Sequence, residues 1–205
     1  PRMILVETPS NPLLRLTDFE LVCKLAKAHN TLVAADNTFL SPSLQKPIEL
    51  GADLVMHSTT KYINGHGDVV GGAVISKTPE LHEQMAWWGN CLGLTGSAFD
   101  SYMILRGLRT LEVRLKQQQE NAEKVVGFLN DHPGVRVVHY PGLPGHKGHE
   151  IAQKQQKGYG AMLSFELQGD ENTVRAFLKG LKLFSLAESL GGIESLVAHP
   201  ALSLV

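Results

Sequence analysis

The chain has 205 residues, of which 43% are hydrophobic, and its formal net charge is -1. This length suits one large domain or one and a half, and the hydrophobic content is sufficient for a packed core. A near-neutral chain without an apolar run of about 18 residues has no feature that attracts nucleic acid or spans a bilayer, so neither partner is expected.

Cysteine content and the two ends of the chain bear on compartment and completeness. Cys23 and Cys91 are too few for a disulfide framework, which is typical of a reducing compartment and favours the cytoplasm. Residues 3–6 already form an apolar run close behind Pro1, and residues 201–205 are apolar without a stop signal. We interpret the chain as an internal segment of a longer protein.

Short apolar runs alternate with amphipathic segments as far as residue 130, which predicts buried strands connected by helices. The strands are expected at residues 3–6, 32–36, 53–57 and 69–75. The helices are expected at residues 17–30, in a short segment that ends at Gly51, and at residues 79–88, 98–107 and 111–130. This order is the βαβ pattern, and it predicts an α/β fold with a mainly parallel sheet flanked by helices.

The first helix has a start signal and one apolar side. Thr17 or Asp18 is suited to cap its N-terminus, because a short polar side chain there accepts a bond from a free backbone N–H. Its expected apolar face consists of Leu21, Val22, Leu25 and Ala28.

The character of the chain changes after the Asp-His-Pro-Gly sequence at residues 131–134. We expect strands at residues 135–139, 161–167 and 183–186 and a helix at residues 171–181. A polar, glycine-rich turn is expected at residues 189–192. We predict that residues 1–118 are the C-terminal part of a large domain. Residues 119–205 are then most of a smaller, truncated α+β domain.

Lys61 lies in a loop that follows a buried strand. Open α/β proteins bind ligands at the carboxyl ends of their strands, so Lys61 is predicted to be a phosphate clamp or a nucleophilic amine. Ser58 and Thr60 are two residues apart, which places their hydroxyls on one side of an extended segment, where they suit a phosphate. The alternative is a surface lysine before a turn.

Asp36 ends the strand that precedes this one in the chain. An acid at one strand end and a lysine after the next suit pyridoxal 5'-phosphate (PLP), because the lysine bonds to the aldehyde and the acid pairs with the ring nitrogen. The alternative for Asp36 is to cap the turn that begins at Asn37 and Thr38.

Three further features carry weaker functional signals. Asn11 precedes a proline, and its spacing alone favours a turn former over an amide presented to a ligand. The pairs His66 with Asp68 and His146 with His149 lack a third ligand nearby in the sequence, so no metal is expected.

Five motifs, in this order, resemble one protein family. They are ETPSNP at 7–12, ADNT at 35–38, HSTTKY at 57–62, GHGD at 65–68 and ESLGG at 188–192. Over essentially the whole chain, the sequence resembles the PLP-dependent trans-sulfuration enzymes of cysteine and methionine metabolism. Within that family it is most similar to the branch of bacterial cystathionine γ-synthases, through motifs at 86–90, 95–102, 105–111 and 148–158.

The resemblance implies an aspartate-aminotransferase-like (type I) PLP fold and a cofactor site. In it Lys61 is the lysine that carries the cofactor, and Asp36 is the partner of the ring nitrogen. Ser58 and Thr60 match phosphate ligands. Asn11 matches the group beside the phenolic oxygen of the ring, so the resemblance favours its functional role.

The resemblance also implies the substrates. Ser189 matches a contact to the substrate carboxylate, Glu188 beside it bears on substrate choice, and Asn11 lies near the same region. The expected reaction is γ-replacement, which joins an O-acyl-L-homoserine, in this branch O-succinyl, with L-cysteine to give L-cystathionine. The carboxylate-binding arginine, the ring-stacking tyrosine and the residues lent by a neighbouring subunit are expected outside this chain.

Alternatives of two kinds stay open. Within the family they are a cystathionine γ-lyase, a methionine γ-lyase and an O-acylhomoserine sulfhydrylase, which share the site. From another class it is a non-catalytic subunit with a PLP fold, against which the intact Lys61 and Asp36 argue. The assembly that the resemblance implies is a homotetramer built from dimers that share active sites.

Overall fold

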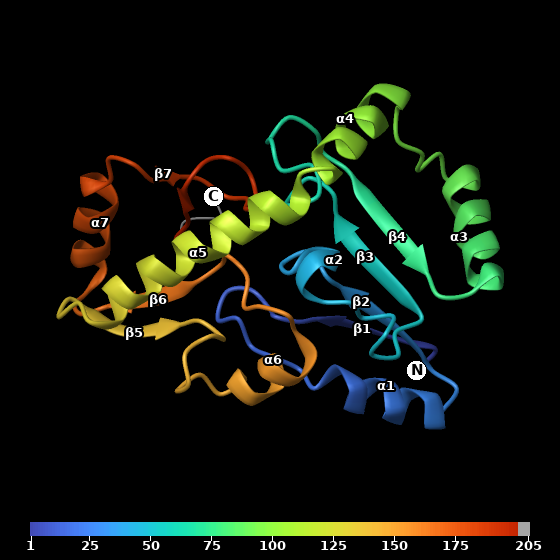
Figure 1. Cartoon of the computed structure of the whole chain (residues 1–205), viewed down its shortest axis with the longest axis horizontal. Helices are drawn as coiled ribbons and strands as arrows, with labels where there is room; N and C mark the ends of the chain where they lie inside the picture. Colours follow the sequence, from blue (N-terminus) through green and yellow to red (C-terminus); the bar gives the residue numbers. More distant parts are fainter. Residues whose placement is uncertain (201–205) are drawn as a thin grey trace.

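The computed structural model describes residues 1–200, and its larger sheet has four strands (Figure 1). Their order is β1 (Met3–Glu7), β2 (Leu32–Asp36), β3 (Leu54–Ser58) and β4 (Gly72–Ser76). The first three strands are parallel, and β4 is antiparallel to β3. The predicted mainly parallel sheet is therefore present, with one antiparallel edge strand. The apolar end at 201–205 lies outside the described residues.

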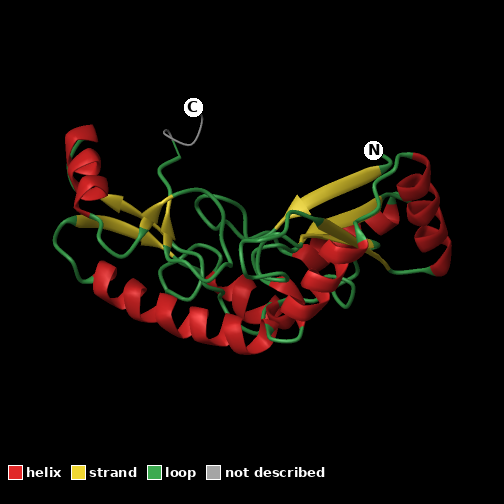
Figure 2. Ribbon diagram, turned by 90° about the horizontal axis from the view of Figure 1, so that it is seen from above, coloured by secondary structure: helices red, strands yellow, loops and turns green. Residues whose placement is uncertain are grey.

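Five helices accompany these strands in the part of the chain up to residue 130. They are α1 (Phe19–Ala28), α2 (Ser41–Leu44), α3 (Pro79–Cys91), α4 (Ala98–Leu108) and α5 (Leu111–Asn130). Figures 1 and 2 show α5 running from the region of the larger sheet to the second half of the chain. Within residues 1–200, no helix is long and apolar enough to cross a membrane.

Helix α1 packs on one face of the sheet, mainly through residues that were not predicted. Its buried side chains are Phe19, Cys23 and Ala26, which pack against residues such as Val33 and Val55. Of the predicted apolar face, Val22 packs against this core, but the prediction was wrong for Leu21 and Leu25, which are 51% and 57% exposed. The buried and the exposed residues both follow a helical spacing, so the sequence pattern alone does not decide which of the two sides meets the sheet. The helix begins after Asp18, which caps its N-terminus.

The opposite face of the larger sheet is exposed in this chain. Its apolar side chains include Met3, Leu5, Met56 and Val74, which are 50%, 59%, 36% and 54% exposed. Alternation along each strand places them on one side of the sheet. This face carries no covering layer among the described residues, although its composition is that of a buried surface.

The second half builds a smaller unit. Its elements are β5 (Val135–His139), α6 (His149–Gln155), β6 (Ser164–Leu167), α7 (Glu171–Gly180), β7 (Ser185–Leu186) and β8 (Leu196–Val197). The pair β5–β6 is antiparallel and the pair β7–β8 is parallel. Val126 of α5, Val138 and Tyr140 form its core. The expected α+β arrangement is present, but α5 passes residue 118 without a break, so a domain boundary there stays a prediction.

Buried amides join the second half to the larger sheet. Gln155 in α6 accepts a hydrogen bond from the N–H of Phe19, with N···O 3.2 Å, and so caps α1. Its neighbour Gln156 donates to Gln45 at 3.2 Å, and Gln45 donates to Asn37 at 3.0 Å. Because Gln45 and Asn37 are almost fully buried, these bonds are shielded from water and fix the two halves together.

The structure also differs from the predicted elements elsewhere: β6 begins at Ser164 rather than at residue 161, and β7 at Ser185 rather than at residue 183. The segment before Gly51 is a turn closed by Ala52 N and Pro47 O at 2.9 Å, and the helix α2 lies before it. Strand β4 begins at Gly72 rather than at residue 69. Helix α6 and strand β8 were not predicted, because they are short, with seven and two residues.

The core assignment of α1 leads to a stability prediction. Replacing Phe19 by alanine leaves a cavity against the sheet, so it is expected to lower the free energy of unfolding by about 3–5 kcal/mol. Leu21→Ala, on the exposed side of the same helix, is the matched control and is expected to cost less than about 1 kcal/mol. Urea unfolding measures both, and an equal loss for the two variants would contradict the packing described above.

Candidate active site

Polar side chains end the neighbouring parallel strands β2 and β3. Asp36 is paired in register with Met56, and Ser58 follows Met56 by two residues. Because side chains alternate along a strand, Asp36 and Ser58 point to the same face of the sheet. That face is the exposed one, so the two groups lie at its carboxyl edge beside bare apolar surface.

Asp36 caps the turn that follows β2 through one of its two carboxylate oxygens. The N–H of Thr38 donates to Asp36 Oδ1 at 3.0 Å, which is the turn cap considered as the alternative above. Thr38 in turn accepts a bond from Ser58 N through its Oγ1 at 2.8 Å, so one small motif ties the two strand ends together. Within residues 1–200 no hydrogen bond engages Oδ2, which leaves one carboxylate oxygen for a ligand.

Two titratable groups beside Asp36 have altered acidity. Glu7 is the register partner of Asp36 on β1, and its pKa is raised by burial and further by the charge of Asp36. The pKa of the neighbouring His57 is lowered by burial, an effect that Asp36 opposes. His57 therefore favours the neutral form, and its buried Nδ1 has no hydrogen-bond partner among the described residues.

Lys61 lies in a tight turn directly after β3. Asn64 N donates to Thr59 O at 2.9 Å, and Gly65 N donates to Lys61 O at 2.8 Å, so the turn around Lys61 is closed by backbone bonds. The Lys61 ammonium donates to Ser189 Oγ at 2.8 Å, across 128 positions of sequence. The structure thus brings together the two residues that the resemblance assigned to cofactor and substrate.

Ser189 has a strained backbone. Its φ is 97°, a value that residues other than glycine rarely adopt and that costs of the order of 1–3 kcal/mol. The turn that holds it packs on the residue after Lys61: Leu190 contacts the Tyr62 cluster, and a Cβ on Gly191 would lie 2.6 Å from Tyr62 N. The close packing of the two loops holds Ser189 in this strained conformation.

The sequence analysis missed the role of Tyr62. Its side chain is 2% exposed and packs with Leu111 and Leu115 of α5, and its hydroxyl is hydrogen-bonded to the backbone of Ala161. The only available signal was a large amphipathic residue beside the lysine. These three partners lie 49 or more positions away, so spacing could not reveal them.

The three hydroxyls of the loop differ in their availability. The Ser58 hydroxyl makes no hydrogen bond with residues 1–200, which leaves it open to a ligand. Thr60 Oγ1 accepts from Gly71 N at 3.0 Å and lies 3.3 Å from Gly71 O, so its proton is directed to the backbone in this structure. Thr59 Oγ1 is buried without a hydrogen-bond partner among the described residues.

Asn11 and Glu188 are less closely tied to the site. Asn11 lies in the turn after β1, with its side chain exposed, and its backbone N–H is hydrogen-bonded to the Glu7 carboxylate. Glu188 is exposed beside Ser189, and no hydrogen bond or ion pair in residues 1–200 includes it. Asn11 is connected to the site by its hydrogen bond to Glu7, the register partner of Asp36. Glu188 is connected to the site only because it is adjacent to Ser189 in the sequence.

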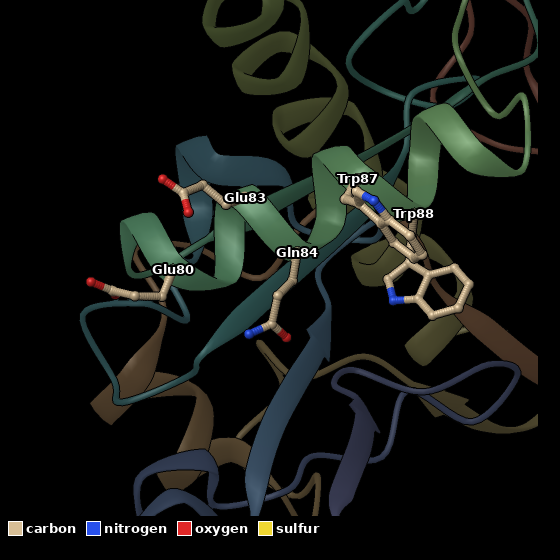
Figure 3. Close-up of a pocket in the computed structure, with 5 residues that line it drawn as sticks. All are labelled: Glu80, Glu83, Gln84, Trp87 and Trp88. Carbon is tan, nitrogen blue, oxygen red and sulfur yellow. The ribbon is translucent and has the colours of Figure 1, made fainter.

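A surface hollow lies elsewhere, along α3 (Figure 3). Its lining residues are Glu80, Glu83, Gln84, Trp87 and Trp88. The two indole rings are exposed and lie edge to face, with their centroids 4.7 Å apart. One helix supplies the whole lining and none of it comes from the Lys61 region, so the hollow is separate from the candidate active site.

The described histidines do not form a metal centre. In residues 1–200 no group of three or more His, Cys, Asp or Glu side chains is placed to hold a metal ion. His149 stacks on Tyr159 with ring centroids 5.8 Å apart, and its Nδ1 lies 2.8 Å from Pro141 O. His146 has its pKa lowered, mainly by burial.

Comparison with known proteins agrees with the motifs. Residues 1–204 match the family model described as Cys/Met metabolism PLP-dependent enzyme. Cystathionine gamma-synthase of Escherichia coli (strain K12) is 58% identical over 201 residues, covering 98% of this chain and 52% of that protein. L-methionine gamma-lyase of Fusobacterium nucleatum subsp. polymorphum is 52% identical over 204 residues, covering 98% and 51%.

Solved structures give the same picture. Cystathionine gamma synthase from Xanthomonas oryzae pv. oryzae, in complex with aminoacrylate and cysteine, superimposes with a TM-score of 0.97 at 61% identity. The match covers 98% of this chain and 52% of that one. The chain therefore spans about half the length of the relatives that it matches.

The paired carboxylates of Glu7 and Asp36 lead to a pH prediction. Because the folded state raises the pKa of Glu7, ionising it costs stability as pH rises from its ordinary pKa to the raised one, and the full cost remains above that window. Glu7→Gln is therefore expected to raise the urea midpoint near about pH 7, and this gain is expected to shrink toward about pH 4. Glu83→Gln on α3 is the control, and a gain independent of pH would contradict the assignment.

Proposed function

Because the chain belongs to the Cys/Met metabolism family of PLP-dependent enzymes and shares their type I fold, we propose that the complete protein is a γ-replacement enzyme. It joins an O-acyl-L-homoserine, with succinyl as the acyl group, to L-cysteine and forms L-cystathionine. The observation that carries this proposal is the contact of Lys61 Nζ with Ser189 Oγ beside the Asp36 strand end. The identity of 58% with a cystathionine gamma-synthase supports the choice of reaction.

The residues present fit PLP, the cofactor of the family. The donor set consists of one amine, one free carboxylate oxygen and one free hydroxyl, supplied by Lys61, Asp36 and Ser58. These are the groups that bond to an aldehyde, pair with a protonated pyridine and donate to a phosphate. The bare apolar face next to Asp36 and Ser58 offers a wall for an aromatic ring.

PLP, when bound, supplies an electron sink that stabilises negative charge on a substrate carbon. Asp36 would hold the proton on the ring nitrogen through Oδ2, because a carboxylate favours a charged partner. The Ser58 hydroxyl would donate to the phosphate. Thr60 is proposed to join it by turning its proton away from Gly71 O, a contact of 3.3 Å that is long and readily given up.

Lys61 is proposed to move protons at the substrate carbons once its amine is free of the cofactor. Ser189 Oγ fixes the amine from one side and is proposed to donate its own proton to the substrate carboxylate. Asn11 and Glu188, at the rim, are proposed to contact the phenolic oxygen of the ring and to bear on substrate choice. These roles require the Ser189 turn to keep its strained backbone conformation and its packing against Tyr62.

The arginine that holds the substrate carboxylate is proposed to lie outside residues 1–205. Arg136 is paired with Glu166 and Arg175 with Glu171, so neither is free for an anion. Arg114 bonds to backbone carbonyls. With these three engaged, we assign the bidentate carboxylate contact of a complete site to the part of the relatives that this chain does not span, as the resemblance implies.

The proposed assembly is a homotetramer of dimers that share active sites, in the cytoplasm. Exposed aromatic side chains on α3 and α4 support an interface there, and they include Trp87, Trp88, Phe99 and Tyr102. A soluble monomer rarely leaves so many aromatic side chains exposed to solvent on neighbouring helices. The amino-acid substrates are the only small-molecule partners proposed.

An assay with two substrate sets tests the reaction. Full-length protein loaded with PLP is incubated with O-succinyl-L-homoserine and L-cysteine, and in parallel with L-cystathionine or L-methionine alone. We expect cystathionine to form in the first reaction. Release of ammonia and a keto acid only in the second would assign a lyase, and no turnover in either would favour the non-catalytic subunit.

The 205-residue chain is a control in the same assay. Without the carboxylate contact and the other wall of the site, its rate is expected to be about a thousandfold or more below that of the full-length protein at equal PLP loading. A comparable rate would mean that residues 1–205 contain the carboxylate arginine.

Replacing Asp36 by asparagine tests the ring-nitrogen role. The side chain keeps its size and its acceptor for Thr38 N but loses the charge, so turnover is expected to fall by about a hundredfold or more, with little change in folding stability. Asp131→Asn, exposed at the end of α5, is the matched control. Turnover within about threefold of the parent enzyme, under 1 kcal/mol in barrier, would exclude the role.

A further inference from the structure

Arg114 of α5 reaches the turn that carries Lys61. Its Nη2 donates to Ile63 O at 3.4 Å and to Gly107 O at 2.8 Å, and its Nε donates to Thr110 Oγ1 at 3.0 Å. The guanidinium therefore bridges the end of the lysine turn and the junction between α4 and α5. Figure 1 shows α4 and α5 following one another, with their junction near the end of β3.

This guanidinium is a charged group without a charged partner. None of the ion pairs within residues 1–200 includes Arg114, and its buried Nη1 has no hydrogen-bond partner there. Burial also lowers the pKa of Arg114. Removing a cation from water without a counter-charge is unfavourable, so packing and carbonyl bonds at this place must offset the cost.

Two glycines allow the turn and the helices to approach this closely. A Cβ on Gly65, whose φ is 73°, would lie 1.9 Å from Arg114 Nη1. A Cβ on Gly107 in α4 would lie 2.1 Å from Asn64 O. Both distances are far below van der Waals contact, so a larger residue at either place would push the lysine turn away from α4 and α5.

The turn transmits this contact to Lys61. Gly65, which packs on the guanidinium, donates its N–H to Lys61 O at 2.8 Å, and Asn64, which packs on Gly107, donates its N–H to Thr59 O at 2.9 Å. If Arg114 is lost, Ile63 O loses its donor and the end of the turn loses the surface that supports it. The backbone of Lys61 is then free to shift.

We propose that Arg114, with Gly65 and Gly107, forms a clamp that positions Lys61 for its contact with Ser189. Arg114 is a positioning residue: it acts through the 59–65 turn and not on a reacting atom. The catalytic consequence rests on the proposed function above, whereas the ordering of the turn does not. A shift of about 1 Å in a catalytic group costs up to about a hundredfold in rate.

The test uses full-length protein and three variants: Arg114→Met, Arg114→Lys and the control Arg109→Met. Arg109 is exposed at the end of α4 and makes no side-chain hydrogen bond or ion pair among the described residues. The first readout is amide hydrogen exchange of a peptide that spans residues 59–67, measured without cofactor. We expect at least about fivefold faster exchange there in Arg114→Met, with the core strands unchanged.

The second readout is made with PLP bound. Visible circular dichroism of the cofactor is expected to change shape in Arg114→Met, and kcat is expected to fall by about tenfold to a hundredfold with KM nearly constant. Arg114→Lys, which can reach one carbonyl, is expected to lie between this variant and the parent. Arg109→Met is expected to stay within about twofold of the parent in kcat.

Unchanged exchange at residues 59–67 in Arg114→Met would overturn the proposal, as would faster exchange spread evenly over the protein. If Arg114→Met does not fold, Arg114→Lys decides by the same local exchange, and loss of folding in both would make Arg114 a general structural residue. A parent enzyme that lacks γ-replacement but shows the expected exchange pattern would remove the proposed function and leave the clamp standing.

Discussion

The burial of Tyr62 is the interaction on which the arrangement of the site depends. Tyr62 follows Lys61 directly in the sequence, and its side chain packs on Leu111 and Leu115 of α5. Leu190, in the turn that contains Ser189, packs against the same cluster. Burial raises the pKa of its phenol, which stays neutral and bonds to the backbone of Ala161. One ring thus joins the sheet edge, the long helix and the second half of the chain.

The consequences follow from geometry. Tyr62 is held on α5, and the amine of the preceding residue, Lys61, is hydrogen-bonded to Ser189 Oγ at 2.8 Å. The strain at Ser189 is compensated by packing contributed from both halves. Sites assembled from distant segments in this way are rigid only if the segments are locked by their neighbours.

Local patterns predicted part of this structure and failed where distant contacts decide. The parallel strands and the polar groups at their ends, Asp36 and Ser58, could be read from apolar runs because sheet edges collect such residues. The buried face of α1 could not, since Phe19 and Leu21 belong to equally regular helical series. Tyr62 and Arg114 were missed because their partners come from elsewhere in the chain. The resemblance, and not spacing, assigned Lys61 and Ser189 to one site, and their direct contact is seen only in the structure.

Because one face of the sheet is exposed, the candidate site is an open surface rather than an enclosed pocket. Asp36 and Ser58 share that face with bare apolar residues, and the chain spans about half the length of its relatives. The central claim is that this surface holds PLP through Lys61. The direct measurement is borohydride reduction of the full-length protein with PLP, followed by mass mapping of the modified peptide. We expect a pyridoxyl group on Lys61, and its presence instead on another residue such as Lys77 would exclude Lys61 as the residue that carries the cofactor.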